Sequence, residues 1–170
     1  MKRLTLMRHG HAEWKDPEIA DFERTLTRRG ASEAEVMARR LAELGLVPTF
    51  LMTSTARRAQ QTAEIVAREL GVPSRRQRSE EALYLATAQD VLQLLKATGP
   101  RIPHLMIIGH NPGLSELARE LAPTLGELDL STGAMCSITF EARAWTSVDP
   151  TVIRDSQHES PSLGLFKMFA

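Results

Sequence analysis

Short apolar runs alternate with longer amphipathic segments along most of this chain, and this alternation is the feature that most constrains its fold. The clearest apolar run, over 105–108, has no polar interruption and predicts a strand that is buried on both faces. In the amphipathic segments the apolar residues recur at helical spacing, and glycine follows where two of the patterns stop, at Gly45 and Gly71. Strands that are joined through helices of this length need crossover connections. The pattern therefore predicts an α/β fold: a three-layer sandwich with a mainly parallel central sheet and helices on both faces.

The same pattern assigns elements to most of the chain, which we expect to form one domain over residues 1–170. A helix is expected from its cap, Thr27, to about Leu44. No element is predicted beyond Asp149, because 157–162 is polar and 163–169 is apolar without a clear period, so the tail 155–170 is left unassigned. The expected strands lie over 4–7, 50–53, 104–108 and 134–140, with a short one within 74–81, and the other expected helices lie over 56–70, 90–96 and 113–121.

The composition argues against several classes of protein. Lys+Arg and Asp+Glu both number 21, so the chain has no net charge with which to bind nucleic acid or an anionic membrane surface. No apolar run approaches the roughly 20 residues of a membrane span. The single cysteine, Cys136, allows neither an internal disulfide nor a cysteine-built zinc site, and we expect it to be a small core residue. A cytoplasmic monomer is the expected state.

Unusual residues follow three of the predicted strands. Arg8-His9-Gly10-His11 comes after the first strand, 54–62 (STARRAQQT) after the second, and Gly109-His110-Asn111-Pro112 after the buried one. In open α/β sheets, ligands bind at the carboxyl ends of the strands. Gly10 and Gly109 are expected where backbone has to come close, since they carry no side chain. Two histidines and at least two arginines at one rim form a cationic pocket, which points to an oxyanion such as phosphate.

These segments resemble the signatures of the histidine phosphatase superfamily, whose fold is phosphoglycerate-mutase-like. RHG at 8–10 matches the first signature, and Gly109-His110 matches the second catalytic histidine. In the register of the family's S-x-x-x-R-A-x-Q-T segment, Arg58 rather than Arg57 is the pocket arginine. The resemblance covers about 2–140. It is greatest to the small SixA-like phosphohistidine phosphatases, whose D-x-x-R-x-L-T-x-x-G pattern is matched at Asp21, Arg24, Leu26, Thr27 and Gly30.

Phosphoryl transfer explains why these residue types belong together. Its loose transition state spreads charge over three equatorial oxygens, and an arginine fork meets two oxygens at once while it stays protonated. His9 can attack as the nucleophile if its other ring nitrogen donates to a backbone carbonyl, which fixes the tautomer. Arg8 and Arg58 would clamp the phosphoryl oxygens, and His110 would donate a third hydrogen bond. The helix from about Gly113 would point its N-terminal dipole at the same site.

The general acid is the open part of this predicted site. An alkoxide leaving group needs a proton, which a carboxylic acid with a raised pKa could give. The family resemblance puts such a residue near Glu80 and Glu81, and counting from Thr62 without gaps favours Glu81, although the flanking residues do not match the mutase-type motif. The P–N bond of a phosphohistidine is labile and needs less help. A weak or absent acid therefore favours a phosphoramidate substrate over an alkyl phosphate.

Other polar residues have plainer interpretations. Asn111 either contacts the substrate or, as we favour, caps the turn that follows it. His104 and His158 are expected on the surface. The arginines within 75–78 form either a solvated face or a surface for a partner. Scattered histidines without closely spaced carboxylates do not make a metal site, so we expect neither a metal nor another cofactor.

Together these observations predict an enzyme, a metal-independent histidine-type phosphatase that works through a phosphohistidine intermediate. Mutases and sugar phosphatases of the family are longer and build a lid from insertions, so the short connections here predict an open site that admits a protein phosphohistidine. A small-molecule phosphomonoesterase on the same residues is the nearest alternative. A non-catalytic module that binds a phosphorylated ligand is the alternative of another class, although a binding module has no need of a nucleophile such as His9.

Overall fold

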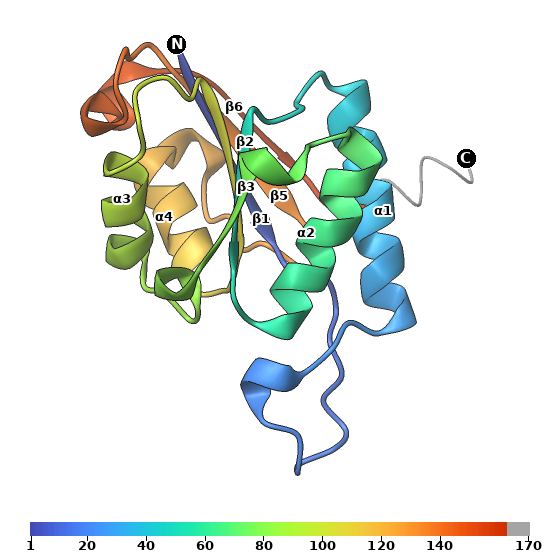
Figure 1. Cartoon of the computed structure of the whole chain (residues 1–170). Helices are drawn as coiled ribbons and strands as arrows, with labels where there is room; N and C mark the ends of the chain where they lie inside the picture. Colours follow the sequence, from blue (N-terminus) through green and yellow to red (C-terminus); the bar gives the residue numbers. More distant parts are fainter. Residues whose placement is uncertain (163–170) are drawn as a thin grey trace.

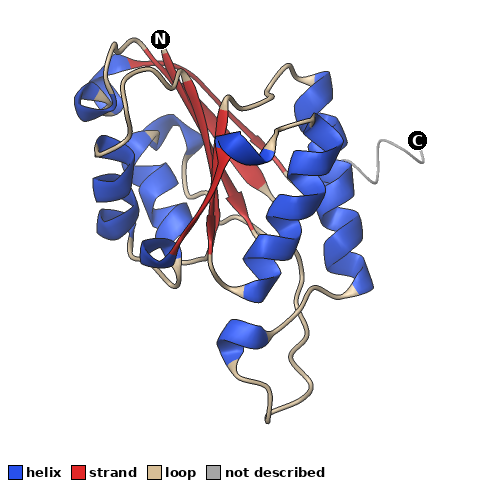
Figure 2. Ribbon diagram, viewed as in Figure 1, coloured by secondary structure: helices blue, strands red, loops and turns tan. Residues whose placement is uncertain are grey.

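The computed structural model describes residues 1–162, which fold around one central six-stranded sheet (Figures 1 and 2). The strands are β1 (Lys2–Arg8), β2 (Phe50–Ser54), β3 (Gln77–Glu80), β4 (His104–Gly109), β5 (Met135–Phe140) and β6 (Ile153–Glu159), and the α-helices are α1 (Arg28–Glu43), α2 (Arg57–Leu70), α3 (Ala88–Lys96) and α4 (Gly113–Leu121). The sheet has the order β3-β2-β4-β1-β5-β6, in which the first four strands pair in parallel and β5 and β6 pair antiparallel. The prediction of an α/β sandwich with a mainly parallel sheet is confirmed.

Helices cover both faces of the sheet: α1 and α2 lie on one face and α3 and α4 on the other (Figure 1). Alternate residues of β4 point to the two layers. Leu105 and Ile107 pack in the core that includes α3 and α4, whereas Met106 and Ile108 pack in the core that includes α1 and α2. This burial on both sides explains the uninterrupted apolar run in the sequence. None of the helices within residues 1–162 is long and apolar enough to span a membrane.

The ends of the helices follow local capping chemistry. The hydroxyl of Thr27 accepts a hydrogen bond from the amide of Gly30, so α1 begins where the sequence predicts it. Gly45 and Gly71 follow α1 and α2 with φ of 69° and 70°, a left-handed conformation that glycine adopts without a steric penalty. Helix α3 begins at Ala88, two residues before its predicted start, because Thr87 and Asp90 form a reciprocal capping box.

Two features of the fold differ from the sequence predictions. No strand is predicted beyond Asp149, yet β6 pairs with β5 at the edge of the sheet; its sequence, IRDSQHE, is largely polar and so carries no apolar alternation. The prediction that His104 lies on the surface is wrong. It begins the central strand β4, is 7% exposed, and places its Nε2 atom 2.8 Å from the hydroxyl of Thr5.

Cys136 is fully buried, as predicted. The predicted apolar stretch 163–169 lies outside the described residues.

A close backbone approach fixes the segment that follows β1. A Cβ atom built on Gly30 would lie 2.0 Å from the carbonyl oxygen of His11, and one built on Gly10 would lie 2.5 Å from the carbonyl oxygen of Gly30. Real Cβ atoms do not come this near to backbone, so both positions require glycine. At Gly109 the nearest atom is a side-chain carbon of Leu114 at 3.6 Å, an ordinary contact. The expected close approach therefore occurs at Gly10 and not at Gly109.

We predict that Gly30→Ala destabilises the protein, because the added methyl group displaces the backbone of His11 from α1. The cost should be about 1–3 kcal/mol, even after the gain in helix propensity. Gly99→Ala is the matched control, since a Cβ atom there meets nothing within 4 Å. Thermal and urea unfolding of both variants measure the effect. A Gly30→Ala variant as stable as the wild type would show that this approach is not a constraint.

Candidate active site

The sheet order brings three strand ends together, as the sequence predicts. Strands β2, β4 and β1 are neighbours, and Arg8 at the end of β1 pairs with Gly109 at the end of β4. His9 and His110 therefore leave the sheet side by side, with ring centroids 5.2 Å apart. Arg58, in the first turn of α2, reaches both rings. These three residues are between 4% and 6% exposed, so they form a buried cluster in which Arg58 carries a positive charge.

His9 is held as a neutral ring with one free nitrogen. Its Nδ1 atom lies 2.7 Å from the carbonyl oxygen of Gly10, which can only accept, so Nδ1 carries the proton. Its Nε2 atom is then unprotonated and accepts a hydrogen bond from Nε of Arg58 at 3.2 Å. Burial lowers the pKa of His9 to about 4, and the charges of Arg58 and Arg8 act in the same direction. His9 needs this tautomer, with the proton on Nδ1, to act as the nucleophile predicted from the sequence.

His110 has a hydrogen-bonding partner on each ring nitrogen. Its Nε2 atom lies 2.7 Å from the hydroxyl of Ser54, and its Nδ1 atom lies 3.4 Å from Nη2 of Arg58. Burial lowers the pKa of His110 to about 3, with the charges of His9 and Arg58 adding to the effect. In the neutral ring Nδ1 accepts from Arg58 and Nε2–H donates to Ser54. Because a serine hydroxyl also donates, the opposite tautomer is accessible, and Nδ1–H would then face an oxyanion.

Arg8 presents a second guanidinium at this end of the sheet. Nη1 donates to the carbonyl oxygen of Leu130 at 3.1 Å. Its Nε atom is buried and has no hydrogen-bonding partner among the described residues. A buried donor without a partner costs about 1–3 kcal/mol, which an oxyanion at this position would offset.

Asp21 completes the cluster, although the sequence analysis assigned it no role. It lies in a short 3-10 helix, Asp21–Glu23, in the loop between β1 and α1. Its carbonyl oxygen accepts from Nη1 of Arg58 at 2.7 Å, and its Oδ2 atom accepts from Nη2 at 3.1 Å and from the hydroxyl of Tyr84 at 2.5 Å. Although burial alone would raise its pKa, the hydrogen bonds from Tyr84 and Arg58 lower it below the usual value. Asp21 is therefore a carboxylate at neutral pH.

Tyr84 connects this carboxylate to His110. Its ring packs edge-on against His110 with centroids 5.5 Å apart, and Phe22 packs edge-on against Tyr84 at 5.1 Å. Tyr84 is the only tyrosine of the chain but belongs to no motif, whereas the D-x-x-R match could have drawn attention to Asp21.

The two remaining predicted site residues lie at the edge of this arrangement. Glu81 is exposed in the turn after β3, and within residues 1–162 its carboxylate makes no hydrogen bond or ion pair. The neighbouring Glu80 forms an ion pair with Arg78. The carbonyl oxygen of the Asn111 side chain accepts from the amide and hydroxyl of Ser115, and its nitrogen donates to Leu130 at 2.8 Å. This is the turn-capping arrangement, and any contact of Asn111 or Glu81 with a substrate stays a prediction.

The N-terminus of α4 directs two of its first amides to the chain itself. The amide of Leu114 donates to the carbonyl oxygen of His110 and that of Ser115 to the side chain of Asn111. These two donors are therefore not free for a phosphoryl group.

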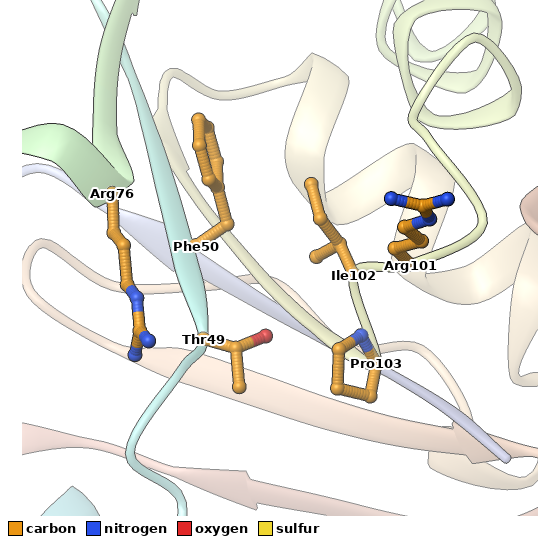
Figure 3. Close-up of a pocket in the computed structure, with 6 residues that line it drawn as sticks. All are labelled: Thr49, Phe50, Arg76, Arg101, Ile102 and Pro103. Atoms are coloured by element: carbon orange, nitrogen blue, oxygen red, sulfur yellow. The ribbon is translucent and has the colours of Figure 1, made fainter.

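The arginine cluster of the sequence lies at the other end of the sheet. Arg76 lines a hollow with Arg101, Phe50 and Thr49, where β2 and β4 begin (Figure 3). Figure 3 shows the guanidinium groups of Arg76 and Arg101 pointing in different directions, so they do not converge on one anion. Arg57, in contrast to Arg58, is exposed. In the described part of the chain, no three His, Cys, Asp or Glu side chains are grouped so that they could hold a metal ion.

Comparison with known proteins gives consistent matches. The family model for the histidine phosphatase superfamily (branch 1) matches residues 4–81. An uncharacterised chloroplastic protein of Arabidopsis thaliana is 30% identical over 131 residues, which cover 71% of this chain and 59% of that protein. An uncharacterised protein of Mycobacterium tuberculosis is 36% identical over 121 residues, which cover 71% of this chain and 72% of that protein. The solved structure of the protein histidine phosphatase SixA complexed with tungstate is 26% identical, with a TM-score of 0.77, and the alignment covers 95% of this chain and 98% of that one.

We predict that Arg58→Ala lowers kcat/KM on a phosphorylated substrate by about 100-fold or more, because a buried charge that faces both histidines is lost. Arg57→Ala is the matched control: the preceding residue of the same helix is exposed, and its loss should change kcat/KM by about twofold at most. Steady-state kinetics of the two variants measure the difference. Equal losses would show that Arg58 has no special place in the site.

We also predict that His9 stays unprotonated at Nε2 from pH 8 down to about pH 5, because its pKa lies near 4 rather than 6.5. Titration of the ring nitrogens by NMR tests this, with His9→Ala used to assign the signal; a midpoint near 6.5 would contradict the prediction. Folding lowers this pKa, so the unfolded chain binds more protons below pH 6.5. The free energy of unfolding should therefore fall as the pH falls from 6.5 towards 4.

Proposed function

This chain belongs to the histidine phosphatase superfamily, and within that family we propose that it removes the phosphoryl group from phosphohistidine on a protein, through a covalent intermediate on Nε2 of His9. The observation that carries the proposal is the state of His9: Nδ1 donates to the carbonyl oxygen of Gly10, and Nε2 keeps an unprotonated lone pair, which accepts from Arg58. The similar SixA structure is complexed with tungstate, an oxyanion, which supports a phosphoryl group as the ligand of this chain.

In the first step Nε2 of His9 attacks phosphorus, and the P–N bond to the substrate histidine breaks. The leaving imidazole takes a proton from solvent. Arg58 then donates to a phosphoryl oxygen instead of to Nε2, and Arg8 offers its unpaired Nε–H to another. The developing charge on the transferred group is thereby stabilised by groups that are already in position.

In the second step water attacks phosphorus and the bond to Nε2 breaks, which releases phosphate and restores neutral His9. The proton on Nδ1 matters for this step. The carbonyl oxygen of Gly10 cannot remove it, so the phosphorylated ring is a cation and departs as neutral imidazole. The water gives its proton to the departing phosphate or to solvent, and no metal ion is needed for either step.

The carboxylate beside the reacting atoms supports the proposed substrate class. Asp21 contacts Arg58 directly, but its lowered pKa makes it a poor proton donor at neutral pH. Glu81 is exposed, and within residues 1–162 its carboxylate makes no hydrogen bond or ion pair. An alkyl phosphate would lack the proton that its leaving alkoxide needs, whereas a phosphoramidate nitrogen takes its proton from solvent. The site is therefore suited to phosphohistidine.

Exposed apolar side chains near the cluster support a protein as the carrier of that group. Phe22 packs on Tyr84 and is 38% exposed, and Leu85, next to Tyr84 in the chain, is 57% exposed. Trp14 is 64% exposed and stacks on Arg24, whose guanidinium lies near Asp21. A small phosphate ester bound at His9 would leave these surfaces in water, whereas a polypeptide would cover them.

The deciding experiment compares four substrates at matched concentrations in EDTA: a phosphohistidine protein, phosphoramidate, p-nitrophenyl phosphate and an alkyl phosphate. We predict turnover of the first two, with His9→Ala inactive on both and stably folded. Faster turnover of the alkyl phosphate would favour a small-molecule phosphomonoesterase. Binding of tungstate without turnover of any substrate would favour a binding module, and loss of activity in EDTA would contradict the metal-free mechanism.

In the same assay, Glu81→Gln tests whether the site lacks a general acid that protonates the leaving group. If no carboxylic acid protonates the leaving group, this change alters kcat/KM by about twofold at most on every substrate, as for other solvated side chains. A large loss confined to the alkyl phosphate would identify Glu81 as the acid. A large loss on all substrates would mean that Glu81 orients the phosphoryl group or His9.

A further inference from the structure

We propose that Asp21 is a positioning residue that turns one edge of the Arg58 guanidinium towards the reacting phosphoryl group; this proposal rests on the function proposed above. A guanidinium has five N–H donors in a planar fork. One edge carries Nε–H and one hydrogen of Nη2, and the end carries one hydrogen of Nη1 and the second hydrogen of Nη2. The two sides can therefore serve different partners at once.

The contacts of Arg58 divide in this way. On the edge, Nε lies 3.2 Å from Nε2 of His9 and Nη2 lies 3.4 Å from Nδ1 of His110. On the end, Nη1 donates to the carbonyl oxygen of Asp21 at 2.7 Å and Nη2 donates to its Oδ2 atom at 3.1 Å. The end is thus occupied by one residue, and the edge that faces the two histidines remains for two oxygens of a phosphoryl group on His9.

Asp21 is itself held in place, which a positioning residue requires. The hydroxyl of Tyr84 donates to Oδ2 at 2.5 Å, and the guanidinium of Arg24 lies 3.8 Å from Oδ1. The ring of Tyr84 packs between Phe22 and His110. The carboxylate therefore connects the loop between β1 and α1 to the turn after β3, and its position sets the orientation of Arg58.

The same carboxylate has an electrostatic cost for substrate binding. It places a negative charge against the arginine that receives a phosphoryl group, so it weakens the attraction between the resting site and an anion. The effect of Asp21 on the position of Arg58 and its effect on the attraction of an anion can therefore be measured separately. Loss of the carboxylate should slow phosphoryl transfer, because Arg58 is free to turn, while oxyanion binding stays the same or becomes tighter.

The experiment measures kcat, KM and the dissociation constant of tungstate for the full chain and for Asp21→Ala, Asp21→Asn and Tyr84→Phe. For Asp21→Ala we expect kcat to fall roughly 10- to 100-fold, the scale expected for a misoriented catalytic group, without weaker binding of tungstate. Asp21→Asn should recover part of the loss, since its amide oxygen still accepts from Nη2. Tyr84→Phe should cause a smaller loss of the same kind. Glu23→Gln is the control, because it changes an exposed carboxylate of the same short helix.

Three outcomes would overturn the proposal. Unchanged kcat in Asp21→Ala would show that Arg58 is oriented without it. Parallel losses of kcat, tungstate affinity and melting temperature in Asp21→Ala and Asp21→Asn would indicate a purely structural role. A loss on the alkyl phosphate that far exceeds the loss on p-nitrophenyl phosphate would make Asp21 the general acid instead. Failure of the proposed function is seen separately, as a wild-type protein that turns over none of the four substrates.

Discussion

The buried guanidinium of Arg58 is the constraint on which the rest of the site depends. It is 5% exposed, and a charge at that depth is tolerated only when its donors are satisfied and a counter-charge is near. No carboxylate on α2 supplies these contacts. The loop between β1 and α1 must therefore fold back so that Asp21 reaches the start of α2. The loop's conformation and the orientation of the arginine are consequences of the same requirement.

A second buried charge fixes the segment that carries His9. The carboxylate of Glu33, on α1, accepts from the amide of His11 at 2.8 Å and from the hydroxyl of Thr132 at 3.0 Å. It thus ties the residues after β1 to the turn before β5, where the amide of Gly133 donates to the carbonyl oxygen of His9. Because Gly30 on the same helix contacts His11 backbone to backbone, the proposed nucleophile, His9, is held by packing as well as by hydrogen bonds. A covalent catalyst needs this rigidity, since small displacements of the attacking atom slow the reaction steeply.

The sequence predicts most of this architecture because the signals are local. Each signal depends on residues that are close in sequence, as in the apolar run at 105–108, the cap at Thr27 and the glycine at position 71. The place where the strand ends meet then follows from the rules of parallel sheets. The capping box of Thr87 and Asp90 is also local and could have been predicted. The other features that sequence reasoning missed depend on distant partners. Edge strand β6 has a polar sequence, and its pairing with β5 is long-range. The contact between Tyr84 and Asp21, which are 63 residues apart, depends on how two loops pack, and no periodic pattern in the sequence predicts it.

Burial gives this site its chemical preference. The same loss of solvent that keeps His9 neutral, and so nucleophilic, lowers the pKa of His110 and surrounds the bound phosphoryl group with charge that water does not screen. Among the described residues, the carboxylate in contact with these groups is Asp21. The hydrogen bonds from Tyr84 and Arg58 hold its pKa below the usual value, so it orients the arginine but does not deliver a proton at neutral pH. A site that stabilises charge on phosphorus but offers no acid discriminates by leaving group. We therefore propose that it accelerates transfer from nitrogen, which solvent can protonate beforehand, more than transfer from an alkoxide. The proposed preference for phosphoramidates is then a consequence of using the available carboxylate to hold Arg58.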